Sequence, residues 1–126
     1  MAPGESPPIT VLVVEDEPML LEVVVDELRD AGFNVLSAGT GEEACEYIWG
    51  DRCPDVLFTD IRLPGSIDGW DIAEQFRTAC PDQPVIYATG FATLPVRRVP
   101  KSRLFEKPYR PSKIIGAIEE MMGRAA

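Results

Sequence analysis

Residues 9–18 read Ile-Thr-Val-Leu-Val-Val-Glu-Asp-Glu-Pro, an apolar run that ends in three acidic residues and a proline. A run of this length with branched apolar side chains predicts a buried β-strand. Pro18 fits the first turn of a helix, where its missing N–H leaves no hydrogen bond unmade. The apolar residues that follow recur with helical spacing as far as Gly32. This stretch therefore predicts a strand that leads directly into an amphipathic helix.

The same alternation continues along the rest of the chain. Further strands are predicted at residues 33–37, 56–59, 84–88 and 103–105, and further helices from Thr40, over 68–79 and over 111–122. Alternating helices and nearly continuous apolar strands are typical of a parallel sheet that carries helices on both faces. We therefore expect an α/β fold with a doubly wound, five-stranded parallel sheet. Pro95 and Pro100 restrict the segment before the fifth strand, so the fourth helix should be short or disordered.

Length and composition predict one folded domain. The chain has 126 residues, and we expect the domain to span residues 9–124 with no output domain after it. Residues 1–8 hold three prolines and a glycine without a basic start or an apolar core, which predicts a disordered leader and no export signal. The apolar runs are far shorter than the roughly 20 residues that cross a bilayer. We therefore expect a soluble, cytoplasmic protein.

Charge and residue types exclude several classes of function. The formal net charge of −9 argues against direct nucleic-acid binding, which usually needs a basic surface. The absence of histidine removes the commonest general base and the commonest zinc ligand. Cys45, Cys53 and Cys80 are odd in number and fit no zinc spacing, so we expect reduced thiols that pack as small apolar residues.

Polar residues follow the predicted strands at their carboxyl ends. Glu15, Asp16 and Glu17 follow the first strand, Asp60 the third, Thr89 and Gly90 the fourth, and Lys107 and Pro108 the fifth. Doubly wound sheets bind their ligands at this rim, so these side chains should converge. Crowded carboxylates repel one another unless a cation binds between them, and Mg²⁺ suits a site with few carboxylates. We therefore predict a Mg²⁺ site beside a hydroxyl and an ammonium that could stabilise a phosphoryl group.

Five motifs carry a resemblance to a known family. They are Val-Leu-Val-Val-Glu-Asp-Glu-Pro at 11–18, Leu-Phe-Thr-Asp at 57–60 with Leu-Pro-Gly at 63–65, Asp-Gly-Trp at 68–70, Ala-Thr-Gly at 88–90, and Phe-Glu-Lys-Pro-Tyr at 105–109. In this order they resemble the receiver domain of response regulators in two-component signalling, from about Ile9 to Met122. The resemblance implies a CheY-like sheet with the strand order 2-1-3-4-5.

The resemblance also implies a role for each site residue. Asp60 would be the phosphoacceptor, and Asp16 and Asp60 would ligate Mg²⁺ directly. Glu15 would act through a metal-bound water, and the backbone carbonyl of Arg62 would complete the protein ligands. Thr89 would bond the phosphoryl oxygens, and Lys107, followed by a cis-Pro108, would pair with the phosphoryl group.

Two features depart from the family pattern. Leu104 stands where such receivers usually carry an aromatic residue on the fifth strand, and strand alternation turns Phe105 to the opposite side. The stretch from Phe91 to Ser102 is expected to be a mobile loop that becomes ordered on phosphorylation. Tyr-Ala-Thr-Gly-Phe at 87–91 is similar to a motif of the Phe-Ala-Thr-Gly type in a subgroup of stand-alone receivers.

The implied function is that of a phosphorelay switch. The domain would take a phosphoryl group from a sensor histidine kinase or a histidine phosphotransfer protein, and would change its interactions with a downstream protein. It would catalyse its own phosphorylation and dephosphorylation without being a conventional enzyme. Two alternatives stay open: a phosphate-independent interaction module, and a receiver excised from a hybrid histidine kinase. A flavodoxin-like carrier is disfavoured, because three acids stand where a phosphate loop needs glycine and hydroxyl groups.

Overall fold

The computed structural model describes residues 7–90 and 97–123. Within them lie five strands, β1 (Thr10–Val14), β2 (Asn34–Ala38), β3 (Val56–Asp60), β4 (Val85–Thr89) and β5 (Ser102–Glu106). The helices of the same residues are α1 (Pro18–Asp30), α2 (Gly41–Ile48), α3 (Gly69–Ala79) and α4 (Pro111–Met121). The predicted alternation of strands and helices is confirmed.

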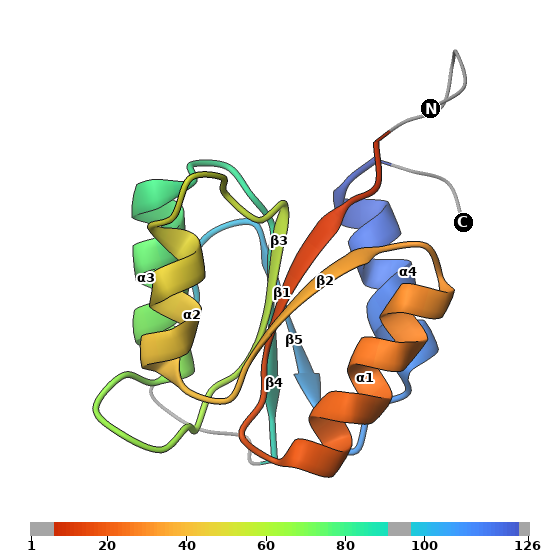
Figure 1. Cartoon of the computed structure of the whole chain (residues 1–126), viewed down its shortest axis with the longest axis horizontal. Coiled ribbons are helices and arrows are strands. Elements are labelled where there is room, and N and C mark those ends of the chain that lie inside the picture. The colour runs from red at the N-terminus through yellow and green to blue at the C-terminus, as the bar shows by residue number, and fades with distance from the viewer. Residues whose placement is uncertain (1–6, 91–96, 124–126) are drawn as a thin grey trace.

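The strands form one parallel sheet with the order β2-β1-β3-β4-β5, as expected. Helices α1 and α4 cover one face, and α2 and α3 cover the other (Figure 1). In the sheet register, Val14 lies opposite Thr59, and Asp60 lies opposite Ala88. The carboxyl ends of the three central strands therefore reach the same rim of the sheet.

Strand alternation divides the core into two halves. Leu12 and Val14 point toward α2 and α3, whereas Val11 and Val13 point toward α1 and α4. Every residue of β3 and β4 is buried, because helices cover both sides of these strands. In the described part of the chain, no helix is both long and apolar enough to cross a membrane.

Two sequence expectations fall partly outside the described residues. Residues 1–6 of the expected leader and residues 91–96 of the expected loop are not described. The described residues before β5, 97–101, contain no helix, which agrees with a short or missing fourth helix. Ser102 belongs to β5 and not to the loop.

The prediction of three reduced thiols is wrong in this structure. Cys53 and Cys80 form a disulfide, and Cys45 is free. An odd number of cysteines excludes complete pairing, but it does not exclude one pair with one residue left over. The fold supplies the proximity, because α3 runs back antiparallel to β3 and returns the chain to the beginning of that strand. The two cysteines are 27 positions apart in the sequence.

Gly69 begins α3 directly against the end of β3. Its N–H donates a hydrogen bond to the carbonyl of Ile61 at 2.7 Å. A Cβ atom at Gly69 would overlap the backbone carbonyl of Asp60. Only glycine therefore allows the helix to start this close to the rim of the sheet.

We predict that Gly69→Ala destabilises the protein by about 3 kcal/mol, because the added methyl group must displace main chain at the end of β3. Gly116→Ala is the matched control, since a Cβ atom there meets nothing within 4 Å and lies inside a helix. It should be neutral or stabilise by about 0.5–1 kcal/mol. Urea unfolding of both variants measures the difference. Equal stabilities would contradict the close approach of α3 to β3.

Candidate functional site

Four predicted site residues come from the ends of three strands and the loop after β5. Glu15 follows β1, Asp60 ends β3, and Thr89 ends β4. Thr89 lies opposite Glu106 in the register, and Lys107 follows at once. The main-chain N–H of Lys107 donates to the carbonyl of Thr89 at 2.7 Å. The parallel register thus brings residues from four segments of the chain to one rim.

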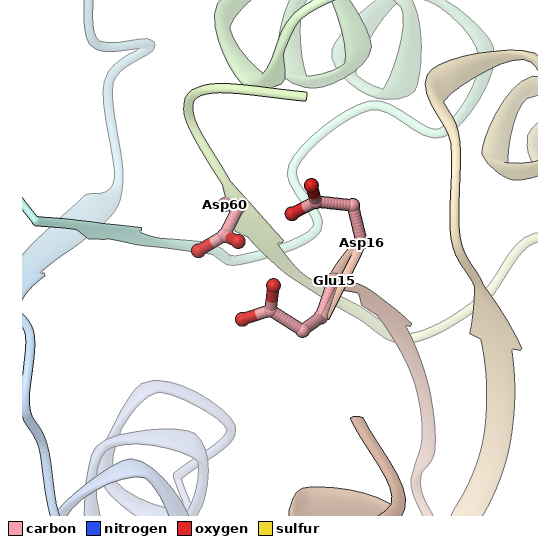
Figure 2. A group of neighbouring side chains, drawn as sticks. All are labelled: Glu15, Asp16 and Asp60. Carbon is pink, nitrogen blue, oxygen red and sulfur yellow. The ribbon is translucent and has the colours of Figure 1, made fainter. Parts of the chain in front are cut away.

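Three carboxylates meet at this rim (Figure 2). Glu15, Asp16 and Asp60 each place one oxygen within 4.8 Å of the other two. Glu15 and Asp60 are buried, with 3% and 6% of their surface exposed, and Asp16 is exposed. Carboxylate oxygens are the ligands that hard divalent cations such as Mg²⁺ and Ca²⁺ prefer. The donor set therefore fits such a cation, with one side open to solvent.

Local hydrogen bonds fix the direction of the Glu15 side chain. The Glu15 N–H donates to the carbonyl of Ala38 at 3.0 Å, which continues the pairing of β1 with β2. The carboxylate of Glu15 accepts the N–H of Glu17 at 3.1 Å. This second bond turns the Glu15 side chain back over the end of its strand.

Lys107 supplies the positive charge of the site. Its Nζ donates to Glu15 Oε1 at 2.9 Å and to Asp60 Oδ2 at 2.9 Å, and it lies 2.8 Å from Asp60 Oδ1. The Lys107 side chain is 26% exposed, so this ion pair is largely shielded from water. The peptide bond between Lys107 and Pro108 is cis, as predicted.

Burial and crowding shift the pKa values of these groups. Burial, and then the hydrogen bond with Glu15, raise the pKa of Asp60 to about 8, although Lys107 opposes the shift. Burial would also raise the pKa of Glu15, but bonds with Asp60, Lys107 and the Glu17 N–H outweigh it and lower that pKa. The pKa of Lys107 is raised, since its bonds to the two carboxylates outweigh the effect of its own burial. One lysine therefore does not balance both acids, and a further cation would favour the ionised Asp60.

A small cavity of about 190 Å³ opens beside Asp60. Its lining residues are Asp16, Asp60, Arg62, Ala88, Thr89, Gly90 and Lys107. Thr89 is buried at the end of β4, whereas Arg62 is exposed in the loop after β3. The cavity therefore joins the carboxylates, the hydroxyl residue and the ammonium in one space. Every predicted site residue lines this cavity except Glu15. Glu15 is hydrogen-bonded to Lys107, which does line it.

Sequence reasoning gave Tyr109 no part in the site, although it follows the lysine by two positions. Its ring packs edge-on against Phe58, with 5.4 Å between the ring centroids. Burial, followed by the charges of Glu15 and Asp60, raises the pKa of the Tyr109 hydroxyl. Tyr109 therefore stays neutral, and its ring adds a mostly apolar surface next to Lys107, in the half of the core that contains α1.

Comparison with known proteins agrees with this geometry. The profile of the family described as "Response regulator receiver domain" matches residues 11–119. The "Probable transcriptional regulatory protein TcrX" of Mycobacterium tuberculosis is 39% identical over 90 residues, which are 71% of this chain and 38% of that protein. The chain thus spans well under half the length of this relative.

Two solved structures show the same fold. A response regulator receiver protein from Sinorhizobium medicae WSM419 is 33% identical, with a TM-score of 0.87 over 92% of this chain and 95% of that one. The receiver domain from the hybrid histidine kinase CckA is 26% identical, with a TM-score of 0.75 over 90% of this chain and 98% of that one. The structure has a five-stranded parallel sheet with an acidic rim, and the family profile matches residues 11–119. This chain therefore belongs to the response regulator receiver domain family of two-component systems.

Proposed function

We propose that this chain receives a phosphoryl group on Asp60 from a phosphohistidine and thereby switches its protein partners. One observation carries the proposal: the buried Asp60 carboxylate lies within reach of two further carboxylates and directly beside the Lys107 ammonium. A structural acid at a strand end would need neither the other acids nor the cavity. The donor would be a sensor histidine kinase or a histidine phosphotransfer protein.

In the transfer, an oxygen of Asp60 attacks phosphorus while the bond from phosphorus to the histidine nitrogen breaks. The imidazole keeps the electron pair of that bond and takes up a proton. Lys107 donates hydrogen bonds to Glu15 and Asp60 in this structure. During the transfer it would shift one of these bonds to a phosphoryl oxygen. Charge develops on those oxygens in the transition state, so the ammonium acts by electrostatic stabilisation.

Mg²⁺ is the divalent cation that fits this role. Asp16 and Asp60 would bind it directly, Glu15 would hold one of its waters, and the main-chain carbonyl of Arg62 would complete the set. When bound, Mg²⁺ neutralises the negative charge that gathers on the carboxylates and the phosphoryl oxygens. The raised pKa of Asp60 supports a cation requirement, because the carboxylate must be ionised to act as a nucleophile.

Thr89 would respond to the phosphorylation of Asp60. It ends β4 and lines the same cavity as Asp60. A phosphoryl group adds about −1.5 to −2 charges and three acceptor oxygens, which favours a hydrogen bond from the Thr89 hydroxyl. Formation of this hydrogen bond would then alter a surface of the receiver domain, residues 9–124. The altered surface would select a downstream protein in the cytoplasm.

We predict that a small phosphodonor, phosphoramidate with Mg²⁺, adds one phosphoryl group to the wild-type chain. Asp60→Asn should abolish the addition, because the amide is not a nucleophile. Lys107→Met should slow it by about 100-fold, since one stabilising charge is lost. Intact-mass spectrometry with time measures the product.

Asp68→Asn is the matched control for Asp60. Asp68 caps α3 by accepting the N–H of Asp71 at 2.9 Å, and asparagine can make the same bond. This variant should react at the wild-type rate. Phosphorylation of Asp60→Asn at the wild-type rate would refute the assignment of Asp60. Partner binding that is unchanged by phosphorylation would instead favour a phosphate-independent module.

A second prediction concerns the metal. EDTA should stop the reaction with phosphoramidate, and added Mg²⁺ should restore it. Asp16→Asn should weaken Mg²⁺ binding by about 10-fold or more, because one ligand carboxylate is lost, while Asp68→Asn should bind like the wild type. Backbone NMR titration with Mg²⁺ and then beryllofluoride measures both affinity and location. Equal Mg²⁺ affinity of the Asp16 variant and the wild type would remove Asp16 from the ligand set.

A further inference from the structure

A disulfide lies at the rim of the sheet opposite to Asp60. Cys53 is in the loop that leads into β3, and Cys80 is the C-cap residue of α3. Their sulfurs are bonded, and their Cα atoms are 5.9 Å apart. Asp60 is at the other end of β3. The bond therefore links the beginning of β3 to the end of α3, away from the carboxylate cluster.

The two cysteine residues differ in their exposure to solvent. Cys80 is 2% exposed and packs in the core half that contains Phe76. Cys53 is exposed and lines a cavity of about 600 Å³ together with Arg52 and Pro54. Thiol–disulfide exchange requires a thiolate to approach one sulfur in line with the bond. A small external thiol can therefore reach Cys53, while protein atoms cover Cys80.

The third cysteine is placed to stay out of this chemistry. Cys45 is half-buried on α2. Burial, and then the charges of Glu42 and Asp71, raise the pKa of its thiol. A thiol with a raised pKa is protonated at neutral pH and attacks disulfides poorly. The chain therefore holds one disulfide with a single exposed cysteine, Cys53, and one thiol that does not compete with it.

We propose that Cys53 and Cys80 form a reversible thiol–disulfide exchange site, in which Cys53 takes the external thiol and Cys80 resolves it. In the reducing direction, a thiolate attacks the sulfur of Cys53, and the bond to Cys80 breaks. The sulfur of Cys80 leaves with the electron pair and takes a proton from water. A second thiolate then attacks the external sulfur, which releases a small-molecule disulfide and the Cys53 thiol. The reverse sequence, with a small-molecule disulfide as the oxidant, restores the bond.

The redox state of this site sets the stability of the fold. The bond closes a loop that contains all of β3 and α3, and its two cysteines are 27 positions apart. Closing such a loop restricts the unfolded chain and so favours the folded state. The site is at the amino end of β3, so a change there leaves the acids at the carboxyl end in place. The redox state of the disulfide and the phosphorylation of Asp60 would thus act at opposite ends of the unit formed by β3 and α3.

Mass spectrometry of the whole chain in buffers of reduced and oxidised glutathione tests the proposal. The oxidised wild type should lack two hydrogens relative to the reduced form and carry no glutathione. Cys80→Ser should carry one glutathione on Cys53, because the resolving thiol is missing. Folded Cys53→Ser should carry none on Cys80. Cys45→Ser is the control and should behave like the wild type.

Thermal unfolding supplies the second readout. Full reduction should lower the Tm of the wild type and of Cys45→Ser by about 10 °C, and should leave Cys53→Ser unchanged. The proposal is overturned if oxidised glutathione leaves the wild type with two free thiols at Cys53 and Cys80. It is also overturned if Cys80 captures glutathione as readily as Cys53. Phosphorylation by phosphoramidate should occur in both redox states, so failure of either idea leaves the other testable.

Discussion

The contact of Lys107 with Glu15 and Asp60 is the interaction on which the site depends. Two carboxylates that are almost fully buried need a positive charge close by, because water no longer screens their repulsion. Lys107 provides it at 2.8–2.9 Å, from a segment 92 positions away from Glu15 in the sequence. Only the parallel register of β1, β3, β4 and β5 brings these groups together. One lysine does not balance two ionised acids, and the three carboxylates at this rim could hold a further cation.

The βα unit of β3 and α3 is held at both ends. At the carboxyl end of β3, Gly69 begins α3 against the main chain of Asp60 and Ile61. At the amino end, the disulfide joins Cys53 to Cys80. Between these two points, α3 packs in the same half of the core as Leu57 of β3, while Val56 and Phe58 of β3 pack in the other half. Asp60 is thus carried by a unit that is held at both ends, which suits its proposed role as a phosphoacceptor, since a nucleophile must stay aligned with its neighbours.

The sequence was informative where physical constraints are local or periodic. Buried parallel strands are continuously apolar, so their ends mark the rim, and the order of residues along the chain was enough to assign the acids, Thr89 and Lys107 to it. The disulfide was not predictable, because its proximity arises only when α3 folds back along β3. The ion pairs of Arg97 with Asp71 and Glu74 were also missed. No pattern in the sequence marks a contact between an irregular segment and a helix more than about 20 positions away.

Leu104 lies beside the strand, β4, that connects the described residues before β5 to the site. Its neighbour across the sheet is Tyr87, which is fully buried and packs on Trp70 with 4.8 Å between the ring centroids. The Tyr87 hydroxyl accepts the N–H of Val99 at 3.1 Å, so turning this ring toward solvent would take this partner from a partly buried donor. The aromatic residue on this side of the sheet is therefore fixed on β4 and not free to rotate on β5. Since Thr89 lies two positions beyond Tyr87 on the same strand, β4 itself links the cavity beside Asp60 to the main chain at Val99.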